Sequence, residues 1–168
     1  MSESLEAERV LRVFDESLAA EDAPRARAAL EELRACAGVD DVVVEYAHAG
    51  LRWLEAGPAA ARELLARVIA LDPSHADAHY DLGCIAEEAG DHAAMVEHFL
   101  RVRTLDARSD RELGIGSEAE LAHIEQVARD VLERLPRLFA ERLGHVPIIL
   151  EQRPSRDLVE EGFDPRAL

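Results

Sequence analysis

The chain contains no lysine, because all 19 of its basic residues are arginines. This absence excludes a lysine that forms Schiff bases and the lysine of a phosphate-binding P-loop. Acidic residues number 35, which leaves a formal net charge of −16. Nucleic-acid phosphates and anionic lipids bind to basic faces, so we expect neither nucleic acid nor a membrane as a partner.

Cysteine and long apolar runs are also scarce. Cys36 and Cys84 lie far apart without a CxxC pattern, as expected for buried thiols in a reducing compartment. No apolar run reaches the length of a membrane span. The acidic start MSESLEAERV lacks the apolar core of a signal peptide. A cytoplasmic location is therefore expected.

Helical periodicity is clearest over residues 76–106. Two apolar stripes with a spacing of three or four residues predict two helices. Gly90-Asp91 between them predicts a helix stop followed by an N-cap. Gly83 predicts a close approach of the second helix to the first. The stripes comprise Tyr80, Leu82, Ile85 and Ala89, then Ala93, Ala94, Val96, Phe99, Leu100 and Val102.

This helical hairpin resembles a repeat of the tetratricopeptide (TPR) family. His79, Leu82-Gly83, Ala86 and Gly90-Asp91 stand at the family's first-helix and turn positions. Met95, Phe99 and Val102 stand at its second-helix packing positions. A second copy has Tyr46, Gly50, Trp53 and Gly57 in its first helix and ends in Leu71-Asp72-Pro73.

A third hairpin precedes these two copies and extends the resemblance to about residues 8–107. Val10, Val13, Phe14 and Leu18 form its first apolar stripe. It is either a repeat or a capping pair, since terminal repeats are usually atypical. Residues 39–44 contain three consecutive valines, which favour a strand. The helical period of the residues that follow leads us to expect a helix there, with an extended entry.

Residues 108–117 (RSDRELGIGS) are charged and contain two glycines, so a linker is expected there. Ser117 and Glu120 then form a predicted capping box that begins a helix ending near Arg134. The β-branched run at 145–151 predicts a short strand. Residues 152–168 are polar and end without a closing element, which suggests a chain that stops in mid-domain.

Residues 119–168 resemble the opening of bacterial minimal zincin-type metallopeptidase domains. The resemblance rests on Leu135-Pro136, the run 146–149, Arg153-Pro154 and the segment 161–165. In that family an HExxH helix further along binds zinc and supplies the catalytic glutamate. No HExxH occurs in this chain, so no catalytic residue and no metal ligand are assigned, and zinc is expected only if such a helix follows. His75 and His79 have i, i+4 spacing, but we expect His75 to precede its helix.

The expected fold is mainly α: TPR-like stacked helical hairpins forming an α-solenoid over residues 1–107, and a linker at 108–117. A partial zincin-like segment at 118–168, with one helix and one short strand, would follow. The resemblance to TPR proteins implies a concave groove that binds a partner. The family pattern assigns this groove to His48, Leu51, Glu55, Asp77, Tyr80, Asp81, Cys84 and Glu88.

A groove rich in carboxylates favours a basic or amphipathic protein or peptide as its partner. The expected function is therefore a protein-binding scaffold or adaptor without catalysis in this chain. The alternative is the N-terminal regulatory part of a zinc metallopeptidase together with a fragment of its catalytic domain. A third possibility is self-association, with a homodimer formed through the lone strand 145–151.

Overall fold

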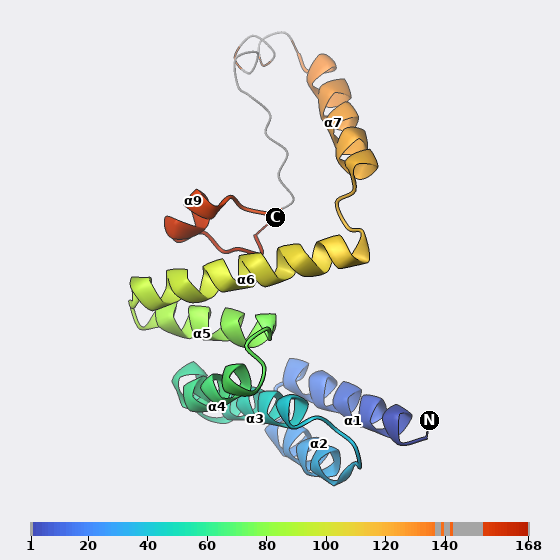
Figure 1. Cartoon of the computed structure of the whole chain (residues 1–168), viewed down its shortest axis with the longest axis vertical. Coiled ribbons are helices and arrows are strands. Elements are labelled where there is room, and N and C mark those ends of the chain that lie inside the picture. Colours follow the sequence, from blue (N-terminus) through green and yellow to red (C-terminus); the bar gives the residue numbers. More distant parts are fainter. Residues whose placement is uncertain (1, 137–138, 140–141, 143–152, 168) are drawn as a thin grey trace. The chain divides into compact units, whose positions relative to one another are not determined.

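The computed structural model describes residues 2–136, 139, 142 and 153–167. This part of the chain is mainly helical, with eight helices and no strand (Figure 1). None of these helices is long and apolar enough to cross a bilayer. The chain divides into two compact units, Met1–Val102 and Arg103–Leu168. The strand expected at 145–151, and any homodimer formed through it, lie outside the described residues.

The first five helices coincide with the helices that periodicity predicts, and the sixth begins where it was expected. Consecutive helices pack on one another, α1 on α2, α2 on α3, α3 on α4 and α4 on α5. The bounds are α1 Ser2–Ala19, α2 Ala23–Ala35, α3 Asp41–Ala56, α4 Pro58–Leu71, α5 Ala76–Glu88 and α6 His92–Leu113.

Capping side chains explain where α3 and α6 begin. Asp40 is extended (φ −67°, ψ 135°), and its carboxylate accepts a hydrogen bond from the backbone N–H of Val42 at 2.9 Å. This cap confirms the helix, with an extended entry, that was expected over the three valines. Gly90 has a φ of +72°, and the Asp91 carboxylate accepts from the N–H of Ala94 at 3.1 Å. The expected turn between α5 and α6 is therefore confirmed.

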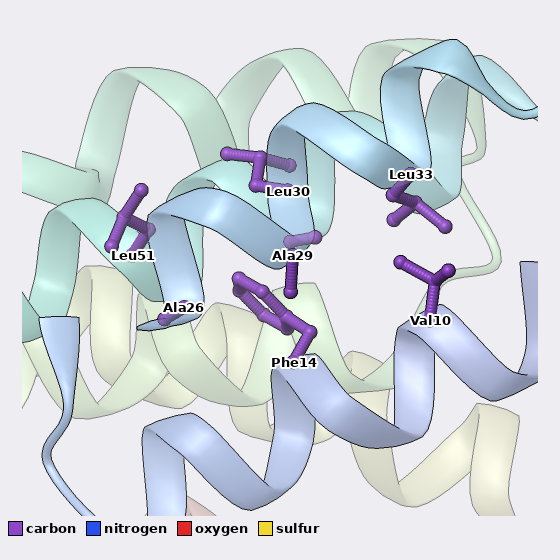
Figure 2. Packing of buried hydrophobic residues seen from close by; sticks show 8 residues of the cluster. Val10, Phe14, Ala26, Ala29, Leu30, Leu33 and Leu51 are labelled. Atoms are coloured by element: carbon purple, nitrogen blue, oxygen red, sulfur yellow. The ribbon is translucent and has the colours of Figure 1, made fainter. Parts of the chain in front are cut away.

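Two apolar clusters hold the first unit together. The first joins α1, α2 and the inner face of α3 around Phe14, which is 2% exposed (Figure 2). The second joins α3, α4 and α5 around Leu65 and Val68. Helix α3 contributes to both clusters, Leu51 to the first and Ala49 to the second. It is therefore the central helix of this unit.

A glycine sets the distance between α5 and α6. A Cβ atom added to Gly83 would overlap the ring of Phe99. That ring is buried and also stacks on Tyr80, with 5.8 Å between the ring centroids. The close approach expected at Gly83 is therefore confirmed.

Helix α6 was expected to end near Asp106. It continues instead to Leu113. The predicted linker 108–117 is thus helical over its first six residues. Arg108 pairs with Glu112 at 3.8 Å in i, i+4 spacing, and Arg111 Nε donates to the carbonyl of Ala107 at 3.0 Å. These contacts let a charged sequence continue a helix. The helix stops at Gly114, whose φ is +71°.

Two more helices follow in the second unit. Helix α7 (Glu118–Glu133) begins at the predicted capping box, in which the Glu120 carboxylate accepts from the Ser117 N–H at 2.8 Å. Its bounds confirm the helix expected there. Helix α9 (Arg156–Glu160) is a short helix that the polar composition of residues 152–168 did not predict.

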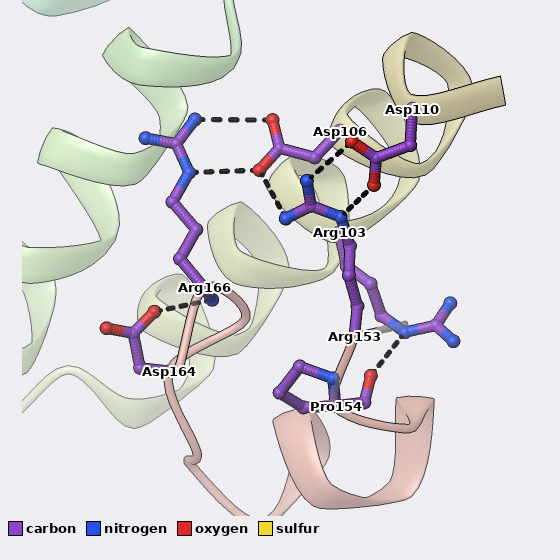
Figure 3. Close-up of polar contacts among 7 residues, drawn as sticks. All are labelled: Arg103, Asp106, Asp110, Arg153, Pro154, Asp164 and Arg166. Atoms are coloured by element: carbon purple, nitrogen blue, oxygen red, sulfur yellow. Dashed lines mark hydrogen bonds and ion pairs between the residues drawn. The ribbon is translucent and has the colours of Figure 1, made fainter. Parts of the chain in front are cut away.

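Residues 153–167 are tied to α6 by a network of arginines and aspartates (Figure 3). Arg153 makes two hydrogen bonds to Asp110, of 2.6 and 3.0 Å, and a third of 3.0 Å to Asp106. Arg166 makes two more to Asp106, of 2.9 and 3.2 Å. Both carboxylates are mostly buried, so this bidentate pairing fixes the segment in place. Residues 153–167 thus form a folded element, although their polar composition suggested a stretch that ends without a closing element.

Candidate functional site

The first unit contains a cavity of about 620 Å³ beside the first helices of its hairpins. Helices α1 and α3 supply most of its wall, and the start of α5 closes it on one side. The fully buried lining residues are all apolar and define its floor, whereas Asp15, Glu21 and Asp77 are exposed. Its lining residues fall into an apolar set, Leu11, Phe14, Leu18, Val43, Ala47, Ala49, Gly50, Trp53, Leu54 and Leu65, and a polar set, Asp15, Glu21, Tyr46, His75, Asp77 and Asp81.

Four carboxylates make this cavity acidic. Asp15 and Glu21 come from α1 and the turn after it, and Asp77 and Asp81 come from α5. No arginine is among the described residues that line the cavity. Desolvation by burial raises the pKa of Asp15, because a carboxylate with less water around it is less stable in its charged form. A cationic group would offset that loss of solvation.

An aromatic bridge connects α3 to the start of α5. The Tyr46 hydroxyl donates to Oδ2 of Asp81 at 3.0 Å. The Tyr46 ring lies 4.5 Å from the ring of His75, centroid to centroid. His75 in turn is the N-cap of α5, and its Nδ1 accepts from the backbone N–H of Ala78 at 3.1 Å. Tyr46 therefore orients both a cavity carboxylate and the helix that carries it.

Glu21 lines the cavity in a conformation that costs energy. Its φ is +53°, and it is the only described residue other than glycine with a positive φ. This left-handed conformation follows the end of α1, where glycine is the usual residue. A backbone position where glycine would be less strained therefore carries a charged side chain that lines the cavity.

Trp53 is the chain's single tryptophan and is half-buried in the cavity wall. Gly50, one turn earlier on α3, has little free space: a Cβ atom added there would lie 3.0 Å from Cδ1 of Leu18. The Trp53 ring is thus an apolar surface that an occupant of the cavity would meet.

Of the eight groove residues assigned by the TPR pattern, Asp77 and Asp81 line this cavity and six do not. The stripe of His48, Leu51 and Glu55 on α3 faces α2 instead. Leu51 is buried in the cluster with α2. Glu55 forms an ion pair with Arg27 of α2 and another with Arg52.

His48 follows the same stripe. The pKa of His48 is lowered, first by burial and then by the positive charge of Arg34 on α2.

The remaining three assigned residues lie on α5 outside the cavity. Tyr80 stacks on Phe99 and belongs to the packing between α5 and α6. Cys84 is half-buried and Glu88 is exposed. The sequence pattern missed Asp15, Glu21 and His75 as lining residues. It named Tyr46 and Trp53 only as packing positions of the repeat.

His75 and His79 do not act as a pair, since His75 caps α5. His79 instead meets His98 of α6, with 3.1 Å between their Nδ1 atoms, and its Nε2 lies 3.3 Å from the carbonyl of Pro73. Burial is the main cause that lowers the pKa of both His79 and His98. No cluster of three or more potential metal ligands occurs within residues 2–136, 139, 142 and 153–167.

Comparison with known proteins adds no relative to this description. No family model, curated protein or solved structure matches the chain. The geometry of the cavity is therefore the basis for a functional proposal.

Proposed function

We propose that this chain is a protein-binding adaptor whose TPR-like helical hairpins hold a basic, amphipathic segment of a partner in the acidic cavity. In this proposal the hairpins stack as an α-solenoid, and α1, α3 and α5 form its binding face. The observation that carries the proposal is a cavity that combines an apolar floor with four carboxylates and has no arginine among its described lining residues.

Two further features support a cationic occupant. The raised pKa of Asp15 means that its carboxylate is incompletely solvated, and a bound arginine or lysine would compensate this. Glu21 keeps a strained backbone while presenting a carboxylate to the cavity. Strained residues cluster at functional sites, where the cost is offset by the rest of the fold.

An amphipathic occupant fits the apolar floor. An amphipathic helix binds by laying its apolar face into a groove, and its specificity comes from charges at the rim. Trp53 and Leu54, which are half-buried in the cavity wall, would contact the apolar side chains, and Asp77 and Asp81 the basic ones. Complementary charge also speeds the encounter between the partners.

Fluorescence of Trp53 provides the test, because this tryptophan is the only one in the chain and lines the cavity. The chain is titrated with a synthetic amphipathic peptide of leucine and arginine, and with a matched peptide of leucine and glutamate. We expect saturable changes in emission with the basic peptide only, and weaker binding at high salt.

Charge-neutral variants locate the binding site. Asp15→Asn with Asp77→Asn should weaken binding of the basic peptide by roughly 2- to 30-fold, given typical energies of exposed ion pairs. Glu63→Gln with Glu97→Gln is the matched control, since it removes the same charge from exposed positions outside the cavity. Equal weakening by both double variants would show unspecific attraction to an acidic protein and refute the proposed site.

A further inference from the structure

Helix α7 carries an apolar face that the described residues cover only in part: Leu121, Ala128 and Leu132 are half-buried, and the rest of the face is exposed. None of its residues is buried. Ile124, Val127 and Val131 are 50%, 47% and 56% exposed, respectively. Local contacts stabilise the helix: a capping box at its start and an i, i+4 hydrogen bond from Gln126 to Asp130. Isolated helices of this length are only marginally stable in water, so burial of this face against a partner would stabilise α7.

The exposed residues form a narrow stripe with charged ends. Glu120, Ile124, Val127, Val131 and Arg134 follow one another at spacings of four, three, four and three residues. At 100° per residue these five positions lie within about 80° of the helix circumference. This alternation is the spacing of the contact seam in coiled coils.

The stripe is self-complementary in one orientation. Glu120 and Arg134 each lie seven residues from Val127, which corresponds to about 10.5 Å along the axis. In an antiparallel pair centred on Val127, each Glu120 would face the Arg134 of the other helix. A parallel pair would place like charges opposite each other at both ends.

We propose that α7 pairs antiparallel with the α7 of a second copy of this chain. The three exposed apolar side chains would form the centre of the contact, and Glu120 and Arg134 would pair across it at both ends. In the capping box, the backbone N–H and the hydroxyl of Ser117 both donate to Oε2 of Glu120. The Glu120 carboxylate therefore keeps its negative charge while it caps the helix.

The pair should be weak. One short helix from each copy buries much less than the roughly 1,200–2,000 Å² of a standard stable interface. The net charge of −16 also opposes association of two copies, although salt screens much of this repulsion. A dimer that forms only as concentration rises is therefore expected.

Sedimentation equilibrium of the whole chain over a wide concentration range provides the test. We expect a monomer–dimer equilibrium for the natural sequence. Val127→Glu and Val127→Arg each place two like charges at the centre of the pair, so each variant alone should be monomeric. An equimolar mixture of the two variants should form dimers again. Circular dichroism should show unchanged helicity, because position 127 is exposed.

The orientation is tested by Glu120→Gln combined with Arg134→Gln. Glutamine keeps the capping box, and the double variant removes both end charges. An antiparallel dimer should weaken by roughly 2- to 30-fold, as expected for two exposed ion pairs, whereas a parallel dimer would tighten. A natural chain that stays monomeric throughout, a mixture no more dimeric than its components, or a tighter Gln/Gln dimer would overturn the proposal.

Discussion

Replacing Gly83 with alanine tests the close contact between α5 and α6. The added methyl group would overlap the Phe99 ring, which cannot move aside easily because it is 2% exposed and stacked on Tyr80. Overpacking of this kind costs about 1–3 kcal/mol. Alanine in place of glycine inside a helix contributes about 1 kcal/mol in the opposite direction. A net loss of up to about 2 kcal/mol in the free energy of unfolding follows.

The same substitution should behave differently once the ring is removed. In a Phe99→Leu background the overlap largely disappears, so Gly83→Ala should become neutral or stabilising by up to about 1 kcal/mol. The coupling energy between the two positions should then be about 1–3 kcal/mol. Urea unfolding followed by circular dichroism and by Trp53 fluorescence measures all four proteins of this double-mutant cycle.

Gly50→Ala provides the control for this cycle. Its added Cβ atom would meet the end of the Leu18 side chain at 3.0 Å, and that flexible group can shift. The free energy of unfolding should therefore stay unchanged or rise by up to about 1 kcal/mol, the usual gain from alanine in place of glycine inside a helix. If Gly83→Ala stabilised the protein equally with and without Phe99, the contact between α5 and α6 would not be as close as described.

Two further predictions concern strain and pH. Glu21→Gly should relieve about 1–2 kcal/mol of left-handed backbone strain, while the added chain entropy of the unfolded state should cost about 0.5–1 kcal/mol. Urea unfolding should therefore show a small gain in stability. Binding of the basic peptide should weaken, because a cavity carboxylate is lost. Because the pKa of His79 and of His98 is lowered in the folded state, the unfolded chain takes up protons first, so stability should fall as pH drops below about 6.5. Unfolding measured from pH 7.5 down to about pH 5.5 should show a shallower loss for His79→Gln with His98→Gln, and an equal loss would contradict the role of this pair.

The helices of the first unit could be predicted from local signals. Apolar residues at helical spacing, glycine at the turns and aspartate at the caps all favour the same assignment, as at Asp40 and Gly90. The prediction of a linker was wrong over residues 108–113, because a charged segment next to glycines has the composition of a loop. The same charged residues can also stabilise a helix, because Arg108 and Glu112 form an i, i+4 ion pair.

The lining of the acidic cavity was only partly predictable, because the TPR pattern assigns residues to a stripe and does not fix the direction in which that stripe points. On α3 the stripe through Leu51 packs against α2, since both faces of this central helix are needed for the two apolar clusters. The strained Glu21 and the cap of His75 depend on backbone geometry that no spacing rule encodes. The contact of Arg153 with Asp110 joins positions 43 residues apart, a separation beyond local patterns.

Amide NMR of the isotope-labelled chain during titration with the basic amphipathic peptide tests the central claim most directly. If the acidic cavity binds this peptide, the largest and saturable shifts should come from Asp15, Tyr46, Trp53, Asp77 and Asp81. Shifts of equal size across the exposed acidic residues of α2, α4 and α6, or no saturable shifts at the cavity, would contradict the proposed adaptor function.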